Sequence, residues 1–205
     1  MNCSLTRVPA GQNGLVPVLV DHAKTRESIA ELACGIVARE GLHSLTMRRV
    51  AAEAGASRAI VSTYFRDMRD LVLATFQWVA SQQVRQFEAA EARGLGVEGC
   101  VEALLPLDQK RLDDWRVTIA FLGYAAADEE LAAIERGRLD GAVVRFERLL
   151  MEEQGLTRST AAIRKEAQRV VSSLLGVAID YAFDPAAQAN PRMRAAMVQR
   201  VLARD

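Results

Sequence analysis

Residues 45–65 read LTMRRVAAEAGASRAIVSTYF, and this stretch decides the fold of the region around it. Thr46 can cap a helix that runs to residue 54, because its hydroxyl can accept a hydrogen bond from a free amide of the first turn. Gly55 can then take a tight turn, and Ser57 can cap a second short helix that ends near residue 65. The small and apolar residues predicted to face the core are Val50, Ala51, Ala54, Ala56, Ile60, Val61 and Phe65. Two short helices joined by a tight turn are the pattern of a helix-turn-helix.

The second of these helices leaves short, polar side chains facing outward. A helix-turn-helix places such residues in the major groove of DNA, where arginine can hold guanine with two hydrogen bonds and small residues allow close approach or meet a thymine methyl group. The residues predicted to face bases are Ser57, Arg58, Ala59, Ser62 and Thr63. The others assigned to the DNA-binding face, where phosphates would pass close to the amide ends of both helices, are Thr46, Arg48, Arg49, Tyr64, Arg66 and Arg69.

The placement of charge bears on this prediction. The chain has 26 basic and 26 acidic side chains, so its net charge does not indicate a nucleic-acid partner. Residues 24–70 alone hold eight basic side chains against six acidic ones, a modest excess that surrounds the predicted face. In a plainer interpretation these arginines only solvate helix faces, and the Ala-Gly-Ala turn is an ordinary helical corner.

The rest of the chain predicts an all-α protein. Half of the residues are apolar, which allows a substantial core, and residues that favour helices dominate the composition. Apolar residues recur at helical spacing, with no strand, internal repeat or low-complexity tract. Helices are predicted over residues 25–40, 47–54, 58–65, 68–91, 101–105, 111–127, 129–153, 159–183 and 190–203, with a cap at Asp128 and a glycine-rich loop over 94–99.

These elements predict three parts: a mobile arm at residues 1–22, a helix-turn-helix domain at 23–67 and a larger helical domain at 68–205. The apolar run at residues 15–20 is interrupted by Pro17 and is too short to span a membrane. The three cysteines are widely spaced, which is not typical of a disulfide framework or a thiolate metal site. We therefore predict a cytoplasmic protein without metal or cofactor.

Residues 25–76 closely resemble the DNA-binding domain of the TetR family of repressors. The resemblance rests on the Ala-Arg-Glu-Gly end of the first helix, the Leu-Thr-Met-Arg-Arg-Val-Ala segment, the Gly-Ala-Ser turn and the Tyr-Phe pair. Ser62 stands where the family commonly has tyrosine, and the Ser-Thr-Tyr-Phe of residues 62–65 is similar to the choline-responsive, BetI-like branch. Met68 stands where the family usually has lysine, so the neighbouring Arg69 is predicted to serve as the phosphate anchor.

Segments at residues 104–107, 115–117, 127–131, 175–180 and 183–185 resemble the BetI-type ligand-binding and dimerisation domain. The resemblance implies an effector pocket among the middle helices and a homodimer formed by the last two helices, at about residues 159–183 and 190–203. The aromatic residues predicted to line the pocket are Trp78, Trp115, Phe121, Tyr124, Phe146 and Tyr181. The residues predicted for the dimer interface are Leu174, Leu175, Val177, Ala178, Val198 and Val201. A choline-like effector follows from the resemblance alone, with Asp180 or Glu129 as the partner of the cation.

Plainer interpretations of the C-terminal part stay open. Aromatic residues at helical spacing belong more often to a core than to a ligand cage. The continuous apolar run at residues 172–179 predicts a surface buried between two copies of the chain, but an internal helix of a monomer is the alternative.

These observations together predict a sequence-specific, ligand-responsive transcriptional repressor that binds double-stranded DNA as a homodimer. An enzyme is one alternative, but the only histidines are His22 and His43, and no catalytic motif occurs. Neighbouring acidic residues at 113–114 and 128–130 diverge by about 100° on a helix, so no catalytic residue is predicted. The other alternative is a helical ligand-binding module that no longer binds DNA, which salt-sensitive binding to a duplex would exclude.

Overall fold

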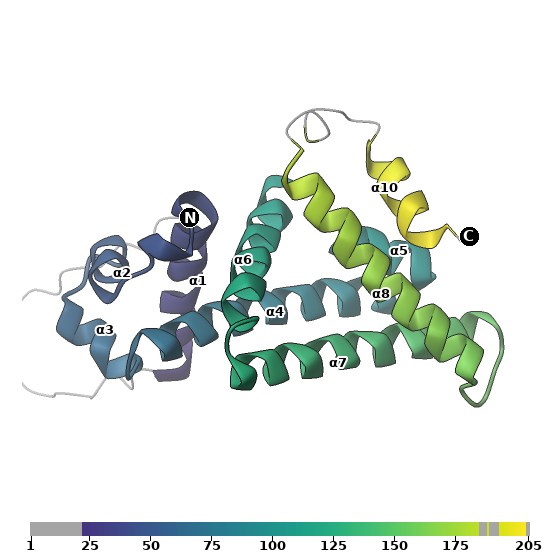
Figure 1. Cartoon of the computed structure of the whole chain (residues 1–205), viewed down its shortest axis with the longest axis horizontal. Helices are drawn as coiled ribbons and strands as arrows, with labels where there is room; N and C mark the ends of the chain where they lie inside the picture. The colour runs from purple at the N-terminus through teal and green to yellow at the C-terminus, as the bar shows by residue number, and fades with distance from the viewer. Residues whose placement is uncertain (1–21, 185–187, 189–192, 204–205) are drawn as a thin grey trace, which may run out of the picture.

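The computed structural model describes residues 22–184, 188 and 193–203, and this part of the chain is helical throughout with no strand (Figure 1). The elements are α1 (His22–Glu40), the 3₁₀ turn η1 (Leu42–Ser44), α2 (Met47–Glu53), α3 (Arg58–Tyr64), α4 (Met68–Ala92), α5 (Gly96–Leu104), α6 (Gln109–Ala125), α7 (Glu129–Glu153), α8 (Ala161–Ala182) and α10 (Met193–Leu202). Among the described residues no helix is both long enough and apolar enough to cross a membrane. The predicted all-α fold is confirmed.

Side-chain caps determine where most helices begin. The hydroxyl of Thr46 accepts a hydrogen bond from the Arg49 amide at 3.0 Å, and that of Ser57 accepts from the Ile60 amide at 3.3 Å. The carboxylate of Asp128 accepts from the Leu131 amide at 3.1 Å and begins α7. Each cap satisfies an amide that has no partner inside its own helix, so the predicted starts of α2, α3 and α7 are confirmed.

Two boundaries differ clearly from the prediction, and a third cannot be compared. His22 is the first residue of α1 rather than part of an arm, while residues 1–21 lie outside the described residues. The loop predicted over 94–99 is wrong in its second half, because α5 begins at residue 96. Val97, Cys100 and Val101 are buried at helical spacing there, and the Glu153 carboxylate accepts a hydrogen bond from the Val97 amide at 2.7 Å. The predicted start of the last helix at residue 190 lies outside the described residues.

Two apolar cores lie along the molecule, and α4 passes through both. The first core joins α1, α2 and α3 to the first half of α4 and the second half of α6, where the rings of Phe76 and Phe121 stack at 3.7 Å. The second core joins the second half of α4 to α5, α7, α8 and α10 and includes Trp115 from the first half of α6. A boundary after residue 67 therefore does not match the packing, because Leu71 and Val79 of α4 belong to the N-terminal core. Figure 1 shows α4 leaving the α1–α3 end of the molecule and running above α7 toward α5.

Candidate functional site

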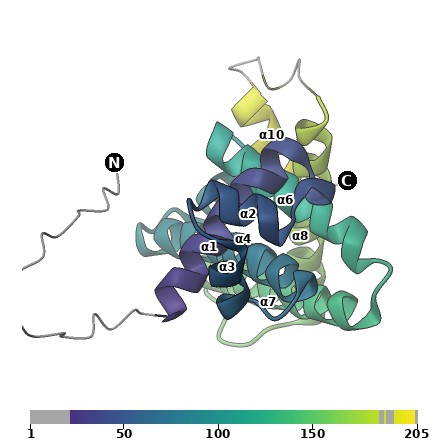
Figure 2. The same cartoon turned by 90° about the vertical axis from the view of Figure 1, so that its left-hand side faces the viewer.

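The α2–α3 unit lies at one end of the molecule and faces the viewer in Figure 2. Gly55 has φ 62°, a conformation that costs glycine little, and the Ala56 amide donates to the Ala51 carbonyl at 2.9 Å across the turn. Ala51, Val61 and Phe65 are buried, so the second helix is held against the first by small and apolar contacts. This is the helix-turn-helix that the sequence predicts.

The outward face of α3 contains the predicted residues and one more. Ser57, Arg58, Ala59, Ser62 and Thr63 are all exposed, as expected for side chains that read bases. The prediction that Ile60 faces the core is wrong, because its side chain is 50% exposed. A helix of seven residues buries only a narrow stripe, and residue 60 lies about 100° away from the buried Val61. Ile60 therefore adds an apolar group to the exposed face, suited to contact with a thymine methyl group.

The arginines of α2 and α3 differ in how they are paired. Arg48 and Arg58 are exposed and make no ion pair with any described residue. Arg49 lies 2.7 Å from both the Glu40 and the Glu53 carboxylates. These hydrogen bonds raise the pKa of Arg49 and hold the pKa of each carboxyl below its usual range. Arg48 and Arg58 therefore carry unpaired charge on this exposed end of the molecule, whereas Arg49 ties α2 to the end of α1.

Arg69 does not stand free as a phosphate anchor, contrary to the prediction. Its guanidinium lies 2.9 Å from the Asp128 carboxylate and 2.8 Å from the Glu130 carboxylate. These residues belong to the start of α7, so Arg69 joins the first turn of α4 to the turn between α6 and α7. Arg66 is the better phosphate candidate, because its side chain is 88% exposed and its contact to Asp70 is loose at 3.6 Å.

A cluster around Arg26 holds the end of α3 in place. Arg26 of α1 lies 2.6 Å from the Asp70 carboxylate, donates to the Tyr64 carbonyl and lies over the Phe65 ring at 4.4 Å from its centre. Asp70 also accepts from the Arg66 amide at 3.0 Å. These hydrogen bonds lower the pKa of Asp70, chiefly through Arg26. Tyr64 is half-buried, and the centre of its ring lies 5.1 Å from that of His22.

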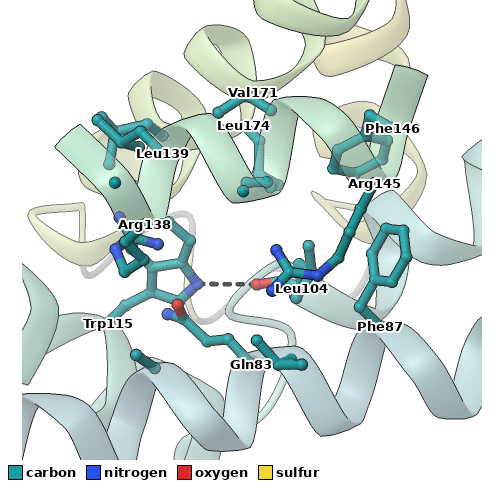
Figure 3. A pocket seen from close by; sticks show the side chains of 16 residues that line it. Gln83, Phe87, Leu104, Trp115, Arg138, Leu139, Arg145, Phe146, Val171 and Leu174 are labelled. Carbon is teal, nitrogen blue, oxygen red and sulfur yellow. Dashed lines mark hydrogen bonds between the residues drawn. The ribbon is translucent and has the colours of Figure 1, made fainter. Parts of the chain in front are cut away.

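A largely apolar cavity of about 140 Å³ lies between α4, α6, α7 and α8 (Figure 3). Its walls include Phe87, Trp115 and Phe146, and the Phe87 and Phe146 rings meet edge to face at 5.3 Å. The indole nitrogen of Trp115 donates to the Leu104 carbonyl at 2.8 Å, which fixes the ring and joins α6 to the end of α5. No acidic side chain lines the cavity.

Two of the six predicted pocket residues, Trp115 and Phe146, line this cavity. Trp78 instead lines a separate hollow beside α1. The Lys110 ammonium lies 5.5 Å from the centre of its ring. The predictions for Phe121, Tyr124 and Tyr181 are wrong, because Phe121 stacks inside the N-terminal core, Tyr124 is 41% exposed and Tyr181 packs against the C-terminal core without lining the cavity.

The predicted cation partners do not reach the cavity either. Asp180 pairs with Arg200 at 2.8 Å on the surface, and Glu129 is exposed at the start of α7. Sequence reasoning also missed the polar residues that do line it, which are Gln83, Arg138 and Arg145. A signal was present, because Gly137 and Gly141 are one helical turn apart on α7 and leave space beside the helix, and Arg145 lies one turn further.

Five of the six side chains predicted for the dimer interface are buried within the single chain. Packing within one chain buries Leu174, Val177 and Ala178 of α8 and Val198 and Val201 of α10. Leu175 is half-buried and lines the cavity. For these residues the prediction is wrong, because α7, α8 and α10 cover one another's apolar faces inside a single chain.

The family follows from comparison of the whole chain. Residues 29–75 match the bacterial regulatory proteins of the tetR family, and residues 95–204, more than half of the chain, match the C-terminal domain of BetI-type transcriptional repressors. The chain belongs to the TetR family, with a C-terminal domain of the BetI type. It is therefore a DNA-binding transcriptional regulator, and the families and relatives that it matches are regulators rather than enzymes.

Individual regulators match this TetR-family chain over nearly its full length. The HTH-type transcriptional regulator PksA of Bacillus subtilis is 24% identical over 192 residues, which cover 91% of this chain and 92% of PksA. A transcriptional regulator of Rhodococcus sp. Rha1 has the same fold with a TM-score of 0.73 at 24% identity, covering 86% of this chain and 94% of its own. A regulator of Saccharomonospora viridis, solved in complex with choline, matches with a TM-score of 0.67 at 20% identity, covering 85% and 94%.

Proposed function

We propose that this regulator is a homodimeric repressor that binds a near-palindromic operator through α3 and is released when a small molecule fills the cavity between α4 and α7. The observation that carries the proposal is the continuity of α4. Its first turns pack in the core of the helix-turn-helix, and Ala80, Gln83, Val84 and Phe87 of the same helix line the cavity. A ligand that moves these residues would move the DNA-binding end of α4 as well.

The ion pairs of Arg69 provide a second connection. Arg69 ties the start of α4 to Asp128 and Glu130, and α7 supplies much of the cavity wall. In a dimer, two α3 helices that read successive major grooves would be spaced by roughly 34–36 Å. An effector that binds better to a second placement of α4 and α7 would shift the population away from this spacing and weaken operator binding.

The proposed dimer packs the exposed side of α8 rather than its buried apolar side. Gln168, Ser172, Gly176 and Asp180 are exposed on α8 at intervals of one helical turn. The middle of this row consists of the small residues Ser172 and Gly176, which allow two helices to approach closely. A β-carbon at Gly176 would meet nothing within 4 Å, so this part of the surface is open in the single chain.

Selection from random DNA tests the DNA-binding half of the proposal. The purified protein is incubated with pooled random duplexes at moderate and at high salt, and the retained fraction is sequenced. Enrichment of a palindromic site, lost steeply as salt rises, supports a dimeric sequence-specific repressor. A folded dimer that enriches no site at any salt would instead be a ligand-binding module without DNA recognition.

The recovered operator then tests release. A compound that binds the cavity should weaken operator binding, and the weakening should saturate with the occupancy of the cavity. A compound that binds with high affinity but leaves operator affinity unchanged would refute effector release.

A further inference from the structure

Two arginines line the cavity between α4 and α7, and they are paired differently. Arg138 donates twice to the Glu135 carboxylate, at 2.8 and 2.6 Å, and both side chains belong to α7. Glu135 is buried behind the lining and does not itself line the cavity, and its carboxylate compensates the charge of Arg138, which does. Arg145 lines the same cavity, is half-buried and has no hydrogen bond or ion pair with any described residue. Figure 3 shows Arg145 extending from α7 toward the middle of the lining residues.

Arg145 therefore brings an uncompensated positive charge to a site with apolar walls. No aspartate or glutamate lines the cavity, and Asp180 and Glu129, which the sequence suggests as partners of a cation, lie on the surface. Partial burial makes an unpaired guanidinium costly, and an incoming anion would remove that cost. Aromatic walls alone could hold a quaternary ammonium ion, but the charge of Arg145 would repel it.

The walls define the body of the ligand. Phe87, Trp115 and Phe146 present rings, while Leu139, Val171 and Leu174 present branched aliphatic groups. A cavity of about 140 Å³ is close in size to cavities of about 150 Å³ that hold a single benzene ring. Gln83 is committed to Thr118 at 3.3 Å and Trp115 to Leu104, so Arg145 is the polar group best able to select the ligand's head.

We propose that the cavity binds a small organic anion, a carboxylate on an aromatic ring or a short aliphatic chain, with its head on Arg145 and its apolar body among Phe87, Trp115 and Phe146. This inference rests on the proposed function, because it names the chemical class of the effector. It departs from the choline-like effector that the sequence resemblance implies.

Direct binding to the full-length protein tests the proposal without DNA. Benzoate and hexanoate are titrated calorimetrically beside their neutral amides, benzamide and hexanamide, and beside choline. At least one acid should bind about 10- to 100-fold more tightly than its amide, since the amide loses a charge-assisted hydrogen bond to the guanidinium. Choline should not bind measurably. Equal affinity of acid and amide, tighter binding of choline, or binding of neither acid would overturn the proposal.

Variants of α7 locate the charge that selects the acid. Arg145→Met should lower the affinity for the bound acid by about 10- to 100-fold, and Arg145→Lys should retain part of it. Arg136→Met is the matched control, because Arg136 lies on the exposed side of the same helix and does not line the cavity. An unchanged affinity in a folded Arg145→Met variant would overturn the proposal, as would an equal loss in the control.

Operator release is measured separately, so that the two proposals can fail independently. Acids that bind through Arg145 but leave the operator bound would refute effector release and keep the ligand class. Release by choline or a neutral compound, with no binding of either acid, would keep effector release and refute the ligand class.

Discussion

The ion pair between Arg26 and Asp70 should determine how firmly α3 is held, and a double-mutant cycle can measure its contribution. Arg26→Met and Asp70→Asn each remove one charge at nearly constant size. The pair is close, at 2.6 Å, and the Asp70 side chain is only 12% exposed, whereas that of Arg26 is 35% exposed. A hydrogen bond between charged groups contributes about 1.5–3 kcal/mol when it is shielded from water, and the exposure of Arg26 lowers this to a coupling of about 1–2 kcal/mol.

The pH dependence gives the prediction a second, independent readout. Because Arg26 lowers the pKa of Asp70 below its usual value of 3.8, the carboxylate stabilises the native state at any pH above that value. The stabilisation is lost as the pH falls through the lowered pKa of the folded protein. The cost of Asp70→Asn should therefore be constant from about pH 8 to about pH 5 and should shrink as the pH falls below 3.8 and through the lowered pKa of the folded protein.

Urea denaturation followed by far-ultraviolet circular dichroism is the assay, because urea does not screen charge as guanidinium does. Protein concentration is held constant, since dimerisation would make the free energy of unfolding depend on it. The pair between Arg116 and Asp113, with side chains 39% and 36% exposed, is the control and should give a coupling of only about 0.2–0.5 kcal/mol. A coupling at Arg26 and Asp70 no larger than the control, or a cost of Asp70→Asn that does not change with pH, would refute the reasoning.

Three further predictions concern stability, assembly and DNA recognition. Burial raises the pKa of Asp114, so the charge of its carboxylate destabilises the fold at neutral pH. Asp114→Asn should therefore raise the melting temperature near neutral pH and lose this advantage in acid. A lower melting temperature of the variant at neutral pH would contradict this prediction. Gly176→Arg should leave the protomer folded but shift the molar mass measured by light scattering from dimer to monomer. Gly123→Arg, at another exposed helical glycine with open space around it, should remain dimeric. If both variants are dimeric, the proposed α8 surface is excluded. Arg58→Ala should relax base preference at one operator position at a cost of about 1–3 kcal/mol of binding free energy. Arg48→Ala should weaken binding to all DNA sequences alike and reduce the slope of log affinity against log salt concentration by about one. Equal, sequence-independent losses in both variants would contradict this division.

Much of the DNA-binding end could be predicted because its signals act over a few residues. Thr46 and Ser57 cap their helices through amides three positions away, and Gly55 takes the turn between them. The Ile60 error arises because short-range signals do not show which side of α3 packs. Val61 of α3 and Phe65 directly after it form the buried stripe, and residue 60 lies about 100° away from Val61 on the exposed side.

The roles of the arginines depend on partners that are distant in the sequence. Arg69 is 59 residues from Asp128, so nothing near Arg69 in the chain indicates that its charge is already paired. Arg26 and Asp70 are 44 residues apart and meet only because α1 packs against α4. A count of charges along the sequence treats all of these arginines alike. Only the fold distinguishes the paired arginines from the unpaired Arg48 and Arg58.

The sequence by itself determined the helices, the helix-turn-helix and the family, because caps, turns and apolar spacing are properties of short segments. Only the tertiary structure decided which aromatic residues meet at the cavity, which face of α8 stays exposed and which arginine remains unpaired. Trp115 and Phe146 come together with Arg145 because α4, α6, α7 and α8 converge there, while Phe121 turns into the other core. Such encounters depend on the packing of whole helices against one another, which no short segment encodes alone.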